Sequence, residues 1–190
     1  MTRIAAGSLK GMVLAVPRHI RATQDKVRQA LFNILGEQVA GARVLDGFAG
    51  SGAIGLEALS RGAREVVLLE SHPESLQAIR KNVAALPEGE AGGRVEVIVG
   101  DALQSLRRLG ESENPFDLIV LDPPYEGPWG KNALIVVGEC AMLSPAGTLV
   151  VEQARQCPPP DGAGSLICVK RHRYGDTVLS FYARCLSGHL

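Results

Sequence analysis

Cysteine, aromatic residues and long apolar runs are scarce in this chain of 190 residues, and each scarcity excludes a class of protein. The four cysteines (140, 157, 168 and 185) form no Cys-x-x-Cys pair and have no histidine at ligand spacing, which favours small buried thiols over a metal site or a disulfide scaffold. No apolar run approaches the about 20 residues of a membrane helix. The hydrophobic content of 46% is normal for a globular protein with a sizeable core.

The sequence does not predict a signal peptide, because Arg3, Lys10 and Arg18 interrupt any apolar core near the N-terminus. We therefore expect a soluble, cytoplasmic monomer that acts without a membrane or a metal ion.

The net charge is zero, but the charges are unevenly distributed. Residues 1–28 hold six basic residues and one acid, residues 29–154 hold nine basic and seventeen acidic residues, and the tail from residue 155 holds five basic and two acidic residues. Basic ends around an acidic middle indicate a polyanion held at the periphery, although solvated basic faces without a partner would look the same.

The most informative stretch is Asp122-Pro123-Pro124-Tyr125, which follows the apolar run 118–121. Such a run predicts a buried parallel strand, and open α/β sheets bind their ligands where the strands end. The prolines remove two backbone donors, so the Asp122 carboxylate and the Pro123 carbonyl remain as acceptors. Beside the flat ring of Tyr125, they suit a planar group that carries an NH2. The alternative is a proline-rich turn capped by Asp122, with Tyr125 packed at its rim.

Residues 1–37 have the pattern of an appendage. Two short apolar runs around the loop 7–11 predict a hairpin, and helical periodicity follows from Thr23, a plausible N-cap, to a stop at Gly36. In residues 38–190, strands and helices then alternate, which predicts a main domain of the α/β class with a doubly wound, mostly parallel sheet. The expected strands are residues 44–46, 66–70, 95–99, 118–121 and 148–152. The expected helices are residues 53–60, 73–85, 103–109 and 133–142. After them we expect a surface turn at 158–162 and a hairpin of strands 166–170 and 177–183.

A glycine-rich loop follows the first of these strands, and acids end the first three strands. Gly50 and Gly52 belong to a formal G-x-G-x-x-G pattern, a weak signal for a dinucleotide site. Asp46 at the end of the strand would repel phosphate but suits an ammonium or sulfonium group. Glu70 ends the second strand and can accept the hydroxyls of a ribose, and Asp101 after the third can accept from an adenine amine. The sequence thus predicts S-adenosylmethionine as the cofactor, with simple helix capping by the acids as the alternative.

Together these residues resemble the class I S-adenosylmethionine-dependent methyltransferases with an Asp-Pro-Pro-Tyr motif, and more narrowly the bacterial RsmD family, which methylates a guanine amine in 16S ribosomal RNA. The glycine loop and the tetrapeptide carry the class. Residues 3–7 and 23–33 carry the family. Ala22 departs from the family pattern, which usually has proline there.

The resemblance implies a seven-stranded Rossmann-like sheet, with the last hairpin inserted antiparallel. It also implies site residues. Those for the cofactor are Thr23, Asp46, Phe48, Gly50, Gly52, Glu70, Asp101, Ala102 and Asp122. Those for catalysis, on a flipped guanine, are Asp122, Pro123 and Tyr125. Ribosomal RNA or an assembling small ribosomal subunit would be the partner, held through Arg3, Lys10, Arg18, Arg21, Lys26, Arg171 and Arg173.

Four alternatives stay open on the sequence alone. Methylation of adenine N6 in DNA or of a protein glutamine N5 would use the same motif class. A nucleotide-binding oxidoreductase would explain the formal glycine pattern, and a non-catalytic RNA-binding module would explain the charge.

Overall fold

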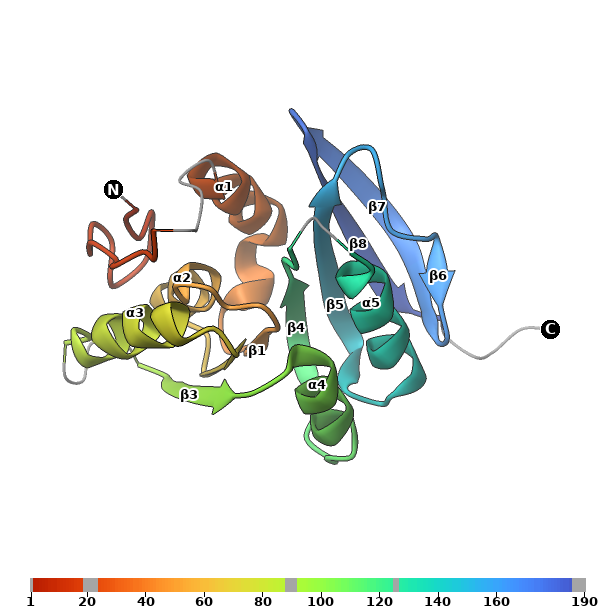
Figure 1. Cartoon of the computed structure of the whole chain (residues 1–190), viewed down its shortest axis with the longest axis horizontal. Coiled ribbons are helices and arrows are strands. Elements are labelled where there is room, and N and C mark those ends of the chain that lie inside the picture. The colour runs from red at the N-terminus through yellow and green to blue at the C-terminus, as the bar shows by residue number, and fades with distance from the viewer. Residues whose placement is uncertain (1, 19–23, 88–91, 125–126, 186–190) are drawn as a thin grey trace. The chain divides into compact units, whose positions relative to one another are not determined.

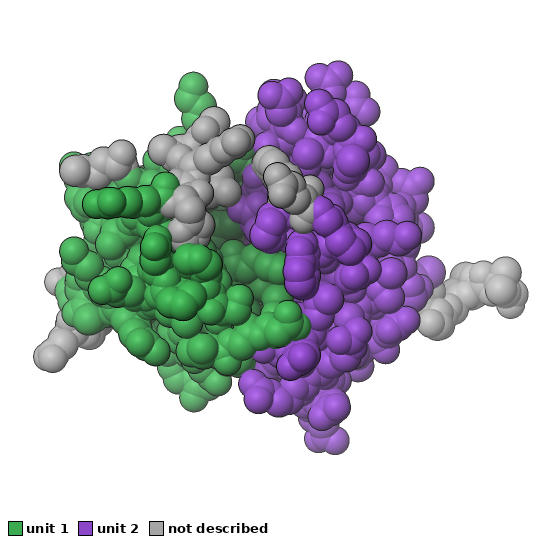
Figure 2. Space-filling model, viewed as in Figure 1, with its two compact units in different colours: residues 1–102 green, residues 103–190 purple. Residues whose placement is uncertain are grey.

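The computed structural model describes residues 2–18, 24–87, 92–124 and 127–185 of the chain (Figure 1). The chain forms two compact units, residues 1–102 and residues 103–190 (Figure 2). The N-terminal segment up to residue 37 lies within the first unit. The domain boundary expected at residue 37 stays a prediction.

The first unit is built on three parallel strands in the order β3-β2-β1, which are β1 (Arg43–Asp46), β2 (Glu65–Glu70) and β3 (Arg94–Val99). Helices α2 (Ala53–Ser60) and α3 (Pro73–Ala84) connect them, and α2 packs against β1 and β2 (Figure 1). All of β1 and all of β2 except its last residue are buried, as their continuous apolar sequences predict. Both strands end at an acid, of which Asp46 is buried and Glu70 is half-buried.

The N-terminal segment is tied to α2 by hydrogen bonds to two side chains. Buried Glu57 accepts the N–H groups of Ala5 and Ala6 at 2.8 and 3.2 Å, and Ser60 Oγ donates to the Ala6 carbonyl at 2.5 Å. Gly7 lies so close to α2 that a Cβ there would overlap the Ser60 carbonyl. The predicted hairpin is present: an antiparallel bridge joins Arg3 to Val13, and the N–H groups of Ile4, Gly11 and Leu14 donate across it to the carbonyls of Met12, Ile4 and Thr2 at 3.0, 2.9 and 3.0 Å.

Helix α1 (Gln24–Leu35) follows, and it ends where the sequence predicts. Gly36 takes the left-handed conformation, with φ of +53°, and starts a short 3-10 helix, η1 (Gly36–Val39). Arg61, the C-cap residue of α2, lies over the Phe32 ring of α1 at 5.0 Å, a cation–π contact within the first unit.

The second unit has five strands in the order β4-β5-β8-β7-β6. Strands β4 (Phe116–Leu121) and β5 (Leu143–Ala154) are parallel, and the other neighbours are antiparallel. The remaining strands are β6 (Gly162–Ala163), β7 (Leu166–Tyr174) and β8 (Thr177–Arg184). The helices are α4 (Ala102–Gly110) and α5 (Trp129–Glu139), and α4 begins at the last residue of the first unit.

The mixed α/β class is confirmed, and β8 lies between β5 and β7 as the inserted antiparallel strand. The expected number of seven strands is one too low for the described residues, because Gly162–Ala163 in the predicted turn pairs with β7. The helix predicted at 133–142 begins four residues earlier and ends at Glu139, where Cys140 turns to extended backbone.

No helix in the described ranges is long and apolar enough to cross a membrane. Over the same ranges, no three His, Cys, Asp or Glu side chains gather as a metal site would require.

Candidate functional site

Asp46, the last residue of β1, is completely buried, and this dominates its chemistry. Its Oδ2 accepts the N–H of Gly55 at 3.1 Å, whereas its Oδ1 is buried without a hydrogen-bond partner among the described residues. Burial raises the pKa of Asp46 from 3.8 to about 7; the N–H of Gly55 opposes this, the Glu70 charge adds to it, and the N–H of Phe48 opposes it. A buried carboxylate with an unused oxygen favours a cationic neighbour.

Glu70, at the end of β2, fastens the glycine loop. Its Oε2 accepts the N–H of Gly50 at 2.7 Å, and its Oε1 accepts those of Ser71 and His72 at 2.7 and 2.8 Å. A carboxylate has about four lone-pair positions, so one on Oε2 remains for a ligand hydroxyl. The side chain is only partly exposed, which holds this acceptor in one direction. The hydrogen bonds of Glu70 to the loop were not foreseen from the sequence.

The glycine loop between β1 and α2 uses several of its own donors. The N–H groups of Ala49 and Gly52 donate to the carbonyls of Leu69 and Ala49 at 2.9 and 2.7 Å. Gly52 is the N-cap of α2 in the left-handed conformation, with φ of +78°, and is buried. The N–H groups of Ala49, Gly50 and Gly52 are therefore satisfied inside the protein. Glycine is required at position 55 too, because a Cβ there would overlap Leu68 and Val66.

The other predicted cofactor residues of the first unit lie where its strands end. Phe48 is half-buried in the glycine loop. Asp101 is exposed immediately before α4, and Ala102, half-buried, is the first residue of that helix. Thus Asp46, Glu70 and Asp101 follow three neighbouring parallel strands, β1, β2 and β3, at their carboxyl ends.

In the second unit, Asp122 and Pro123 follow β4 directly. Asp122 is half-buried, Pro123 is buried and Pro124 is exposed. Leu121 pairs with Val151 of β5, which continues for three more residues to Ala154. Gly130, in the first turn of α5, lets Gln153 and Pro123 pack closely against the helix. A Cβ at this position would overlap the Gln153 carboxamide and lie 3.2 Å from the Pro123 ring. Gln153 is therefore a polar neighbour of the tetrapeptide, and no sequence pattern had singled it out.

The predicted RNA-binding residues differ in whether their side chains form hydrogen bonds within the protein. Arg171 uses all three nitrogens within the protein, on the Ser180 hydroxyl, the Asp161 carboxylate and the Pro159 carbonyl, at 3.2, 2.6 and 2.6 Å. Its guanidinium is thus part of the fold of the second unit. Arg3 donates to the Gly11 carbonyl at 3.1 Å. The others in the described ranges, Lys10, Arg18, Lys26 and Arg173, are exposed.

Three predicted site residues, Thr23, Arg21 and Tyr125, lie outside the described residues. Ala22, the departure from the family pattern, lies outside them as well.

A family model described as "Conserved hypothetical protein 95" matches residues 2–183. The chain belongs to this family. Relatives named "Ribosomal RNA small subunit methyltransferase D" agree with the resemblance to the RsmD family, which is thereby confirmed. One of these, from Haemophilus influenzae, is 34% identical over 158 residues and covers 82% of this chain and 80% of its own.

Further members of the family extend the match to nearly the whole chain. The YlbH protein of Bacillus subtilis, provisionally named an rRNA methyltransferase, is 34% identical over 96% of this chain and 98% of its own. Among solved structures, the yhhF protein of Escherichia coli, provisionally named a methyltransferase, is 30% identical, with a TM-score of 0.82 over 96% of this chain and 97% of its own. This family member therefore shares its fold with the chain described here.

Proposed function

We propose that this protein methylates the exocyclic N2 amine of a guanine in small-subunit ribosomal RNA, with S-adenosylmethionine as the methyl donor. The observation that carries the proposal is the pair of acceptors, the Asp122 carboxylate and the Pro123 carbonyl, held at the end of a buried strand in a chain whose family members are named for ribosomal RNA methylation. Both acceptors would receive the two N–H groups of one amine.

The residues of the first unit fit this cofactor. The Oδ1 of Asp46 is buried and has no hydrogen-bond partner among the residues that the structure describes, which suits a ligand with a cationic amino acid group, because a cation compensates a buried carboxylate. The remaining lone pair of Glu70 suits a ribose hydroxyl, and exposed Asp101 suits an adenine amine. When bound, S-adenosylmethionine supplies an electrophilic methyl group on a sulfonium. Thr23, Phe48 and Ala102 complete the proposed cofactor set.

In the proposed reaction, Asp122 and Pro123 act on the guanine amine, whose lone pair is delocalised into the ring and is therefore a weak nucleophile. Hydrogen bonds from both N–H groups to these acceptors draw the nitrogen toward a tetrahedral geometry and localise its lone pair. Tyr125 supplies a stacking plate for the flipped base. The Gln153 carboxamide would donate an N–H to O6 of the guanine and accept the N1–H with its carbonyl oxygen. Alignment of the reacting atoms provides much of the acceleration.

Exposed basic residues would hold the RNA by its phosphates, which gives affinity without sequence reading. Arg171 is not proposed for this role, since its guanidinium is engaged by Asp161, Pro159 and Ser180. The assembling small ribosomal subunit as substrate, and the monomeric state, stay predictions.

The experiment that tests the function is transfer of a labelled methyl group from S-adenosylmethionine to matched substrates: small-subunit ribosomal RNA, single-stranded DNA and a glutamine-containing protein. Nuclease digestion and chromatography of the labelled RNA should give N2-methylguanosine. Label in adenine N6 of DNA or in protein would replace this proposal with one of the alternatives, and no label in any substrate would favour a non-catalytic RNA-binding module.

A further inference from the structure

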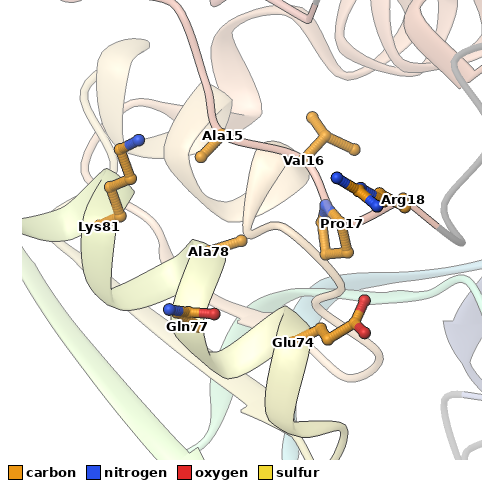
Figure 3. Close-up of a pocket in the computed structure, with 8 residues that line it drawn as sticks. All are labelled: Ala15, Val16, Pro17, Arg18, Glu74, Gln77, Ala78 and Lys81. Carbon is orange, nitrogen blue, oxygen red and sulfur yellow. The ribbon is translucent and has the colours of Figure 1, made fainter.

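A hollow of about 450 Å³ lies on the first unit. Its lining comes from the N-terminal segment (Ala15, Val16, Pro17 and Arg18) and from one side of α3 (Glu74, Gln77, Ala78 and Lys81) (Figure 3). The volume is within the range of small-ligand sites in proteins, so it can accept one nucleotide of a longer strand.

The chemistry of the hollow has three parts. Figure 3 shows Lys81 at one end and Arg18 at the other, and both side chains are exposed. Between them Val16, Pro17 and Ala78 form an apolar wall, and Gln77 adds an amide on the α3 side. Separated cations on either side of an apolar wall suit a phosphodiester strand whose base lies flat between its phosphates.

The wall of the hollow is held in place rather than formed by loose chain. The Asn82 Oδ1 accepts the N–H of Ala15 at 2.8 Å, and its Nδ2 donates to the Ala15 and Ser51 carbonyls, both at 2.9 Å. Asn82 is buried, so these hydrogen bonds are strong constraints. Because Ser51 belongs to the glycine loop, the same amide fixes both the hollow and that loop, and the cations are presented on a preorganised surface.

Glu74 is the one acid in the lining, and it lies at the Arg18 end. A carboxylate there can accept from the exocyclic amine of cytosine, adenine or guanine, while the neighbouring guanidinium of Arg18 binds a phosphate. The set of one acid, one amide and two cations is therefore suited to a nucleotide within a strand, rather than to a free anion such as inorganic phosphate.

We propose that this hollow binds a nucleotide of the single-stranded RNA substrate, with Arg18 and Lys81 on its phosphates. The proposal rests on the proposed function for the identity of the strand. It adds Lys81 and Gln77 of α3 to an RNA surface that the charge pattern of the sequence had confined to the N-terminal segment and the tail.

The test measures binding of a fluorescein-labelled, cytidine-rich single-stranded RNA by anisotropy between 50 and 200 mM salt. The variant Arg18→Ala/Lys81→Ala removes two proposed phosphate contacts, so the slope of log affinity against log salt should become shallower by about 1.4, at about 0.7 per contact on a single strand. The matched control, Arg107→Ala/Arg108→Ala, removes the same charge from exposed positions in the last turn of α4 and should leave the slope unchanged. The charge-preserving variant Arg18→Lys/Lys81→Arg should keep the wild-type slope.

Two results would overturn the proposal. An equal change in the hollow variant and the α4 control would mean that net charge alone matters. A loss of S-adenosylhomocysteine affinity of more than a few-fold in the hollow variant, measured by calorimetry, would place the hollow in the cofactor site. The RNA need not be methylated in this assay, so a wild-type protein that binds RNA through the hollow but transfers no methyl group would reject the proposed function and keep the hollow.

Discussion

The Gly50 N–H donates to Glu70 Oε2 at 2.7 Å, which joins the glycine loop after β1 to the end of β2. A single carboxylate thus fixes the loop and keeps one lone pair for a ligand. This dual use explains why the loop needs few free N–H groups: its position is set by an acceptor on the neighbouring strand.

Replacement of Glu70 tests the cofactor site. Glu70→Ala removes both the proposed ribose acceptor and the anchor of Gly50, so the affinity for S-adenosylhomocysteine should fall by roughly 1.5–3 kcal/mol, as expected for charge-assisted hydrogen bonds. Calorimetry measures this, with Glu96→Ala on exposed strand β3 as the control. Unchanged affinity would remove Glu70 from the site, and tighter binding of NADH than of S-adenosylmethionine would favour an oxidoreductase.

The raised pKa of Asp46 predicts a pH-dependent stability. The folded protein binds a proton there up to about pH 7, whereas the unfolded chain releases it near 3.8. The folded state therefore holds the extra proton between these values, and the free energy of unfolding should fall as the pH rises from about 4 to 7 and then level off, by on the order of a few kcal/mol. Asp46→Asn should lack this decline. Urea titrations at pH 5 and pH 8 compare the two proteins, with Asp176→Asn as an exposed control; parallel pH profiles of wild type and Asp46→Asn would refute the assignment.

A cationic ligand near Asp46 should also release its proton. Cofactor affinity of the wild type is then expected to increase with pH up to about 7, and that of Asp46→Asn to be flat.

Substitutions of Asp122 and Tyr125 should affect different kinetic parameters. Asp122→Ala loses a group that acts in the transition state, so kcat should fall on the order of 10²-fold with an unchanged melting temperature. Tyr125→Ala loses stacking worth about 1–3 kcal/mol and should mainly raise KM, whereas Tyr125→Phe keeps the plate and should be mild. Single-turnover rates beside melting curves decide. A folded Asp122→Ala protein with the wild-type rate would contradict the proposed mechanism. A loss of stability alone would show that Asp122 only stabilises a turn.

Gln153 should affect which base is accepted. Guanine and 2,6-diaminopurine both carry the 2-amine but present opposite donors and acceptors at the N1 and C6 edge. The ratio of kcat/KM for guanine to kcat/KM for 2,6-diaminopurine should therefore fall by about tenfold in Gln153→Leu. This is the low end of what one polar contact to a base contributes. Gln156→Leu, exposed on the following turn, is the control. An unaltered preference would leave Gln153 with a packing role against Gly130 only.

Glu57 predicts a large effect on stability away from the chemistry. It is 1% exposed and accepts hydrogen bonds from Ala5, Ala6 and Arg61, with the Arg28 Nε at 3.8 Å. Glu57→Ala leaves buried Arg28 with less compensation, which costs about 3–5 kcal/mol when a buried pair is broken. At about 2–4 °C per kcal/mol for a chain of this size, scanning calorimetry should show a melting temperature lower by roughly 10 °C. A drop no larger than that of exposed Glu96→Ala would show that the N-terminal segment contributes little.

The sequence by itself determined the α/β class, the end of α1 at Leu35 and the acids that end β1, β2 and β4, because these features depend on local patterns. Apolar runs must be buried, Gly36 tolerates a left-handed backbone, and a parallel strand leaves its last residue at the edge of the sheet. The methyltransferase class was also predicted from the glycine loop and the tetrapeptide, and the family from residues 3–7 and 23–33.

Only the tertiary structure decided what these residues contact. The hydrogen bond from Gly50 to Glu70 spans 20 residues, that from Ala15 to Asn82 spans 67, and that from Ala5 to Glu57 spans 52. Arg171 reads as a free cation in the sequence, yet Asp161 and Ser180 engage it once β7 and its neighbours fold. Such partners are chosen by the meeting of distant segments, where burial makes each polar group find an acceptor or donor, and no local pattern of residue types encodes that choice.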